Sequence, residues 1–131
     1  MLTVGFIGLI ISAGLVSLGP SEAHEGAGGG FVEPKGPAVA TVTVDALPSQ
    51  KFQADEFSTQ SGINEIEYVG KGGNHTLVFQ EQTPEVLGFE LVVGPGQTDS
   101  SKVKLKANDY TIYCTVPGHR AQGMEATLRV Q

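Results

Sequence analysis

The sequence predicts an all-β domain, an antiparallel Greek-key β-sandwich of two sheets, preceded by an N-terminal hydrophobic segment. Three observations support this prediction: β-branched or alternating runs are short, Gly, Pro and Asn separate them, and no stretch has a comparable helical period. The predicted strands are, in order, the runs 38–44, 63–70, 75–80, 86–93, 101–107, 110–116 and 125–130.

Alternation within these runs predicts which side chains face the core. Successive side chains of a strand point to opposite faces, so Ile66 and Tyr68 share one face and the flanking glutamates share the other. In the same way, Val103 and Leu105 lie opposite three lysines. We therefore expect sheets with one face on the core and one face in water.

The amino end is predicted to lie outside this domain. Leu2–Leu18 carries no charge, which favours a signal peptide or a membrane anchor over residues 1–20. The small residues Ser21–Ala23 are compatible with cleavage before His24, but no Lys or Arg precedes Lys35. The two alternatives stay open at this point, and both place the domain outside the cytoplasm.

The next segment, 21–37, is rich in Gly and Pro and is predicted to be a flexible linker. The predicted domain then covers residues 38–131.

The chain has 14 acidic against 8 basic residues, a formal net charge of -6. Nucleic acid is excluded as a partner, because its binding depends on clustered cations. We expect membrane contact only through the N-terminal segment.

The loop "YCTVPGHRAQGM", residues 113–124, contains the only cysteine of the chain, one of three histidines and one of two methionines. Cys114 lies two residues after Ile112, so the two side chains point to the same face of a strand, and Cys114 is expected to point inward. The Pro-Gly pair that follows cannot continue a central strand, so the chain bends and presents His119 and then Met124. A single cysteine also excludes an internal disulfide.

A fourth candidate ligand, His75, follows a Gly-Gly-Asn turn at the head of an apolar strand. Alone, Cys114 or Met124 would be explained as a core residue. Two histidines, a cysteine and a methionine together are typical of a type 1 copper site, whereas zinc rarely takes methionine. The sequence thus predicts one copper ion, Cu(I)/Cu(II), at His75, Cys114, His119 and Met124.

The stretch "YCTVPGHRAQGMEATLRV", with "NHTLVF" upstream, resembles the cupredoxins, the group of azurin, rusticyanin and plastocyanin. The resemblance runs from about residue 38 to residue 131, and its ligand loop is closest to azurin and rusticyanin. It implies that His75, Cys114 and His119 are equatorial ligands and that Met124 is axial. Thr76 stands where many relatives have Asn, and its hydroxyl is expected to hydrogen-bond near the cysteine loop.

The resemblance further implies a one-electron carrier without catalytic turnover, in the periplasm or on the outer face of the cytoplasmic membrane. Its partners would be redox proteins such as a c-type cytochrome or a terminal oxidase, bound weakly and transiently. Electrons would pass through His119, and Arg120 would be a solvated charge or would orient an acidic partner. A copper carrier or storage protein with the same ligands is the alternative. A Cys-His hydrolase is disfavoured, because no orienting carboxylate is evident.

Overall fold

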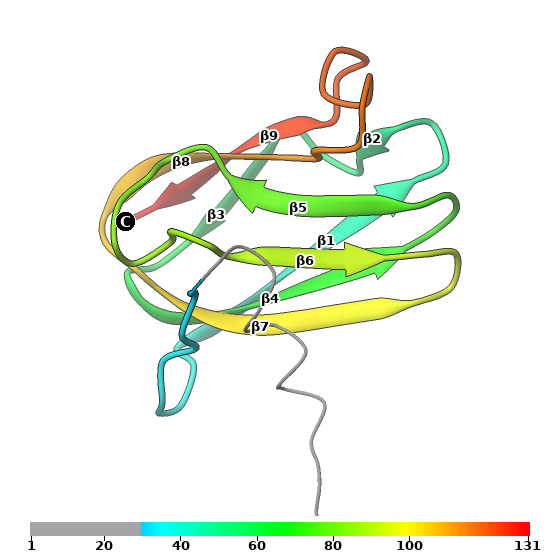
Figure 1. The fold of residues 1–131 in the computed structure, drawn as a ribbon. Helices are drawn as coiled ribbons and strands as arrows, with labels where there is room; N and C mark the ends of the chain where they lie inside the picture. Colours follow the sequence, from blue (N-terminus) through cyan, green and yellow to red (C-terminus); the bar gives the residue numbers. More distant parts are fainter. Residues whose placement is uncertain (1–29) are drawn as a thin grey trace, which may run out of the picture.

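The computed structural model describes residues 30–131, which form an all-β sandwich of two sheets (Figure 1), and this confirms the predicted fold class. Within this range, no helix is long and apolar enough to cross a membrane. The predicted signal peptide or anchor and the first part of the predicted linker lie outside the described residues. The strands are β1 (Ala40–Leu47), β2 (Lys51–Phe52), β3 (Glu56–Thr59), β4 (Gly62–Gly70), β5 (His75–Phe79), β6 (Glu90–Val93), β7 (Thr98–Leu105), β8 (Asn108–Tyr113) and β9 (Glu125–Val130).

One sheet has the order β2-β1-β4-β7 and the other the order β3-β9-β8-β5-β6. The chain changes sheet at most connections, including β4 to β5 and β7 to β8, as a Greek-key sandwich requires. Most pairs are antiparallel, but β1 pairs with β4 and β3 with β9 in parallel. These two parallel pairs were not predicted.

The core lies between the sheets and follows the alternation of the strands. Ile66 and Tyr68 of β4 are buried, as are Val103 and Leu105 of β7, so both parity predictions are confirmed. The ring of Phe79 meets two other aromatic rings edge-on in this core. This packing joins β5, β8 and the turn before β6 within the core.

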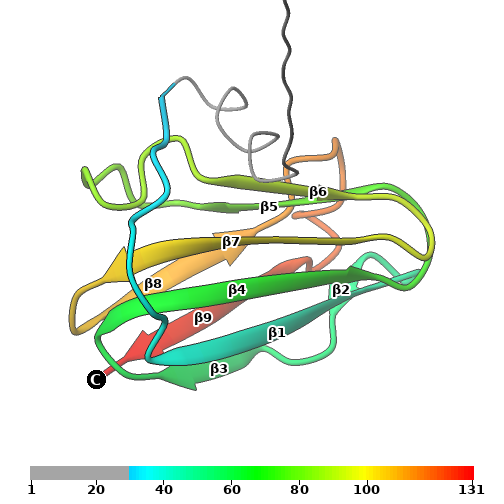
Figure 2. The ribbon, with the colours of Figure 1, turned by 90° about the horizontal axis from the view of Figure 1, so that it is seen from below.

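Residues before β1 also pack on the sandwich. The segment from Gly30 runs past β7 and β4 to reach β1 (Figure 2). Phe31 is buried with its ring 5.2 Å from that of Phe89, and Lys102 Nζ donates to the Gly36 carbonyl over 2.6 Å. The packed part of the chain therefore begins before residue 38.

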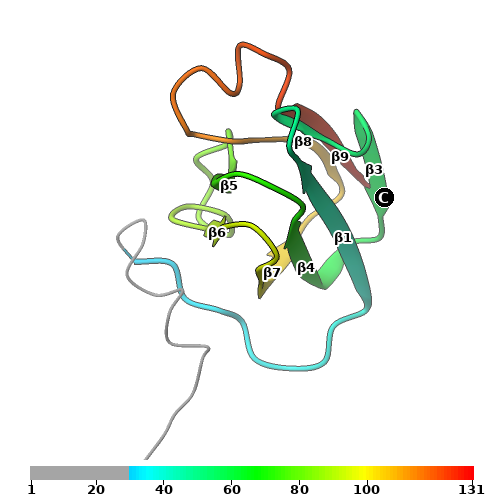
Figure 3. The same cartoon turned by 90° about the vertical axis from the view of Figure 1, so that its right-hand side faces the viewer.

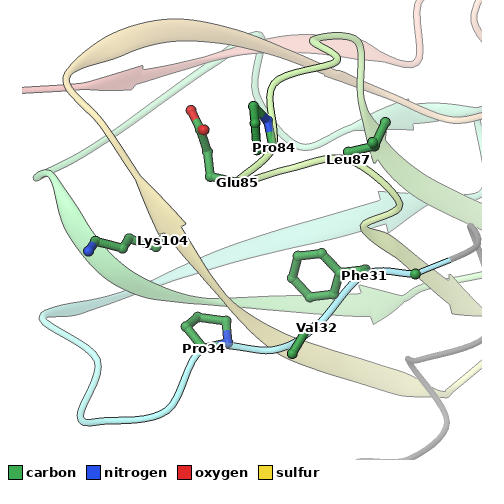
Figure 4. A pocket seen from close by; sticks show the side chains of 8 residues that line it. Phe31, Val32, Pro34, Pro84, Glu85, Leu87 and Lys104 are labelled. Atoms are coloured by element: carbon green, nitrogen blue, oxygen red, sulfur yellow. The ribbon is translucent and has the colours of Figure 1, made fainter.

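Beside this segment lies a surface groove (Figure 4). The segment contributes its apolar side chains to one wall, and the turn before β6 contributes the opposite wall together with a lysine of β7. The labelled side chains are Phe31, Val32, Pro34, Pro84, Glu85, Leu87 and Lys104.

Candidate metal centre

Three of the four predicted ligands meet at one end of the sandwich. His75 is the first residue of β5, Cys114 directly follows β8, and His119 lies in the loop between β8 and β9, drawn in orange in Figure 3. One potential ligand atom from each of the three lies within 4.8 Å of the others. Two segments far apart in sequence thus converge as predicted.

The backbone of the loop closes on itself. His119 N donates to the Val116 carbonyl over 3.0 Å, and Met124 N donates to the His119 carbonyl over 3.1 Å. Cys114 N donates in turn to the Met124 carbonyl over 3.1 Å, which joins the two ends of the loop. Gly118 has φ +87, a conformation that glycine adopts without strain, and the loop can therefore turn immediately before His119.

His75 is oriented by the glycine turn before β5. Its Nε2 lies 2.6 Å from the Gly72 carbonyl, which accepts a hydrogen bond when Nε2 carries the proton. Its Nδ1 is buried and has no hydrogen-bond partner among the described residues. A buried polar atom without a partner is unfavourable unless something else binds it. Since the Nε2 proton leaves a lone pair on Nδ1, that atom is ready to bind a metal.

The Cys114 sulfur is buried and lies against the start of β5. Thr76 N donates to it over 3.4 Å and the Thr76 hydroxyl over 3.7 Å. The hydroxyl oxygen of Thr76 also accepts a hydrogen bond from Thr115 N over 2.7 Å and lies 2.7 Å from the Thr115 hydroxyl. The expected hydrogen bond of Thr76 near the cysteine loop is confirmed, whereas Thr115 was not foreseen. Both contacts fix the position of the sulfur at the start of β5.

His119 completes the group, with its Nδ1 3.5 Å from the Cys114 sulfur. Burial lowers the pKa of His119, and the nearby His75 ring lowers it further. A neutral imidazole is the form that binds metals, so the lowered pKa favours metal binding near neutral pH. The ring centroids of His75 and His119 are 5.1 Å apart.

The arrangement fits a type 1 copper site. One ligand atom from each of the three residues lies within 4.8 Å of the others, and the Cys114 sulfur lies 3.5 Å from His119 Nδ1, so these three residues would be able to hold a single ion. The thiolate is soft and the imidazoles suit copper. Met124 is fully buried at the end of the loop. Its role as the axial ligand stays a prediction.

A tyrosine of the opposite sheet forms a hydrogen bond to the strand that carries His75 and Thr76. The Tyr68 hydroxyl of β4 donates to the Thr76 carbonyl over 2.9 Å, which links the two sheets directly beside the cysteine. Burial raises the pKa of Tyr68, and the nearby Cys114 raises it further, so the hydroxyl stays protonated and donates. Alternation predicted that Tyr68 would be buried, but the hydrogen bond depends on how the sheets pack.

Solved structures of similar fold are known, although their sequences differ widely from this one. Curated protein sequences give no significant match. Among solved structures, auracyanin B is similar with a TM-score of 0.65 at 22% identity, covering 76% of this chain and 94% of that one. An azurin from Methylomonas sp. strain J has a TM-score of 0.59 at 19% identity, covering 72% and 99%. An auracyanin from Roseiflexus castenholzii has a TM-score of 0.57 at 17% identity, covering 72% and 99%.

These structures are too distant in sequence to show more than the fold. Residues 39–131, however, match the family described as copper binding proteins, plastocyanin/azurin family. That match covers most of the chain and includes His75, Cys114, His119 and Met124. The chain therefore belongs to the plastocyanin/azurin family of copper-binding proteins, the cupredoxins.

Proposed function

We propose that this cupredoxin is a type 1 copper protein that carries single electrons between redox partners outside the cytoplasm. The observation that carries the proposal is the convergence of the Cys114 sulfur with nitrogens of His75 and His119 within 4.8 Å. The buried Nδ1 of His75, which no other described group satisfies, supports it. Copper, when bound, supplies a one-electron couple between Cu(I) and Cu(II).

The protein holds the proposed ligands in place before any metal arrives. The Gly72 carbonyl orients His75, and the Thr76 backbone and hydroxyl orient the Cys114 sulfur. Met124 is tied into the loop through its backbone. Ligands held this firmly change position little when the charge of the site changes, so an electron can enter or leave with little rearrangement. We assign no catalytic turnover to the site.

We further propose that electrons leave through His119. Its ring is partly exposed, and the neighbouring Pro117, Gly118 and Ala121 are exposed and uncharged. A partner protein can therefore approach the ring without displacing a charged side chain from these positions. Such contacts are typically small and short-lived. A c-type cytochrome or a terminal oxidase is the proposed class of partner.

Copper loading tests the proposal. Copper(II) added to the metal-free protein should produce an intense visible band from charge transfer between sulfur and copper. The band should saturate at one copper ion per chain. Cys114→Ser should abolish the band, because its oxygen replaces the sulfur. A band of unchanged intensity in Cys114→Ser would show that the colour arises elsewhere and would refute the assignment.

A second measurement separates an electron carrier from a copper store. Electron self-exchange between the oxidised and reduced protein should be fast, and transfer of copper to a chelator should be slow. Rapid release of copper combined with slow self-exchange would favour the storage alternative.

A further inference from the structure

Arg120, the residue after His119, is not simply a solvated charge, which was one of the two roles predicted for it. Its side chain contacts three other residues. The guanidinium carbon of Arg120 lies 3.9 Å from the ring centroid of Tyr113. Its Nε donates to Glu125 Oε1 over 2.9 Å, and its Nη2 donates to Gln80 Oε1. The Arg120 side chain is 38% exposed, so it is partly covered by these partners.

The three partners come from three neighbouring strands. Tyr113 is the last residue of β8, Glu125 is the first residue of β9, and Gln80 directly follows β5. These strands lie side by side in one sheet. Arg120 therefore ties the loop to β8 and β9 at the strand ends beside the candidate metal centre, and through Gln80 to the end of β5 that lies away from His75. We call Arg120, Tyr113, Gln80 and Glu125 the Arg120 clamp.

The loop has few other side chains that hold it. Six of its residues between the two buried ends are exposed: Thr115, Pro117, Gly118, Ala121, Gln122 and Gly123. Its backbone hydrogen bonds shape the turn locally, with Gly123 N donating to the Arg120 carbonyl over 3.0 Å. They do not by themselves tie the turn to the sheet beside it. The Arg120 clamp ties the turn to the sheet, and it does so at the residue that directly follows His119.

The chemistry of the contacts requires arginine. A planar guanidinium can stack on a ring while its edge donates to two oxygens, whereas a lysine ammonium cannot do both. An exposed ion pair alone would contribute little. Here the stack and the two hydrogen bonds act on one planar group from three directions.

We propose that Arg120 is a positioning residue that keeps His119 in place against Cys114 and so sets the properties of the copper site. This inference rests on the proposed function, since it concerns the same site. Loss of the clamp should loosen the loop in the metal-free protein. In the loaded protein, His119 should be held less firmly.

The first test needs no copper. Amide hydrogen exchange of residues 115–123 should become faster in metal-free Arg120→Gln than in the wild type. Arg129→Gln is the matched control, because Arg129 is also an exposed arginine of this sheet that pairs with two carboxylates, those of Glu56 and Asp109. It lies four residues along β9 from Glu125, about 13 Å away at about 3.3 Å per residue. Its loss should leave the exchange of the loop unchanged.

The second test uses the copper-loaded protein. Outer contacts of metal ligands typically change metal affinity by about 10- to 100-fold, and we expect Arg120→Gln to release copper about tenfold faster than the wild type. Its paramagnetic-resonance spectrum and reduction potential should also shift, which a purely structural role elsewhere would not cause. Arg120→Lys should behave like Arg120→Gln, because charge alone does not restore the planar contacts.

The tyrosine of the clamp offers a conservative pair. Tyr113→Phe keeps the ring under the guanidinium and should match the wild type in loop exchange, whereas Tyr113→Leu should resemble Arg120→Gln. Circular dichroism checks that each variant folds. Should Arg120→Gln fail to fold, Glu125→Gln removes the ion pair while Arg120 remains, and the same measurements apply.

The outcomes distinguish this inference from the proposed function. Loop exchange that is equal in wild type and Arg120→Gln would overturn the clamp, whatever the copper experiments show. Faster exchange with an unchanged resonance spectrum and potential would show that the clamp holds the loop but does not position His119, and would also overturn the inference. A wild-type protein without the blue band would refute the proposed function, and the exchange measurement would still decide whether the clamp exists.

Discussion

Thr76 contacts the sulfur of Cys114 twice, with its backbone N at 3.4 Å and its hydroxyl at 3.7 Å. Because both are donors, they withdraw electron density from the sulfur. Thr76→Val removes the hydroxyl and also the acceptor of Thr115 N. We expect a lower reduction potential, since the thiolate becomes the stronger donor. The free energy of unfolding should fall by about 1 kcal/mol, the typical net contribution of one hydrogen bond.

Thr76→Ser is the control for this change, because it keeps the hydroxyl and removes only a methyl group. Voltammetry of the two loaded variants and denaturant unfolding of the metal-free proteins provide the measurements. A potential that falls equally in both variants would show that the hydrogen bond of the hydroxyl is not responsible, because Thr76→Ser keeps it.

The hydroxyl of Tyr68 donates to the Thr76 carbonyl in the buried space between the sheets. Tyr68→Phe would leave that carbonyl without this donor, and we expect a loss of about 1–3 kcal/mol in the free energy of unfolding. Tyr113→Phe is the comparison, since it removes a tyrosine hydroxyl from a half-buried position on the outer face of β8. It should change stability by less than about 0.5 kcal/mol. Equal losses in the two variants would contradict a special role for the link between the sheets.

Gly73 lies in the turn that orients His75, with φ +79. A Cβ at this position would lie 3.1 Å from His75 Nε2, which is tighter than ordinary contact. Gly73→Ala should therefore displace the imidazole and weaken copper binding, in addition to the backbone strain of about 1–3 kcal/mol that a left-handed alanine introduces. Isothermal titration with copper(II) measures the first effect and denaturant unfolding the second.

Gly96 provides a matched control for this substitution. It has φ +74, and a Cβ there would meet nothing within 4 Å. Gly96→Ala should lose similar stability through the same strain while copper affinity stays unchanged. If both alanine variants bound copper like the wild type, the glycine turn would not be what orients His75.

Met124 is fully buried where the ligand loop joins β9. Met124→Leu replaces the thioether by a hydrocarbon of similar volume, and such exchanges usually lower stability by less than about 1.5 kcal/mol. If Met124 is the axial ligand, the blue band should persist while the reduction potential rises, because a weak donor is lost and the site becomes more apolar. Loss of all copper binding would show that Met124 does more than tune the potential, and an unchanged potential would show that it is not a ligand.

Several features of the fold could be predicted because they depend on neighbours in sequence. The alternation of β4 and β7 assigned Ile66, Tyr68, Val103 and Leu105 to the core, where the structure places them. The strand β9 has the bounds of the predicted run 125–130. Alternation is a local property of a strand that is buried on one face, so it can be read from the sequence.

Other strands were not predicted because their signal is weak or distant. β2 has only two residues, Lys51–Phe52, and β3, Glu56–Thr59, has no residue that is fully buried. β3 forms through parallel pairing with β9, which lies far along the chain. The run predicted as 86–93 contains a turn before β6, where Phe89 N donates to the Val86 carbonyl. Apolar side chains in a buried turn resemble those of a strand.

The sequence by itself determined which residues are available for a metal site, because the ligand loop contains the only cysteine and bends at glycine and proline. It also determined the inward direction of Cys114, through the parity of β8. Only the tertiary structure decided that His75 meets this loop, that Thr76 and Tyr68 brace the site, and that Arg120 binds three strand ends. Parity and turn preferences act between neighbouring residues, whereas these contacts exist only once two sheets have packed and brought distant segments together.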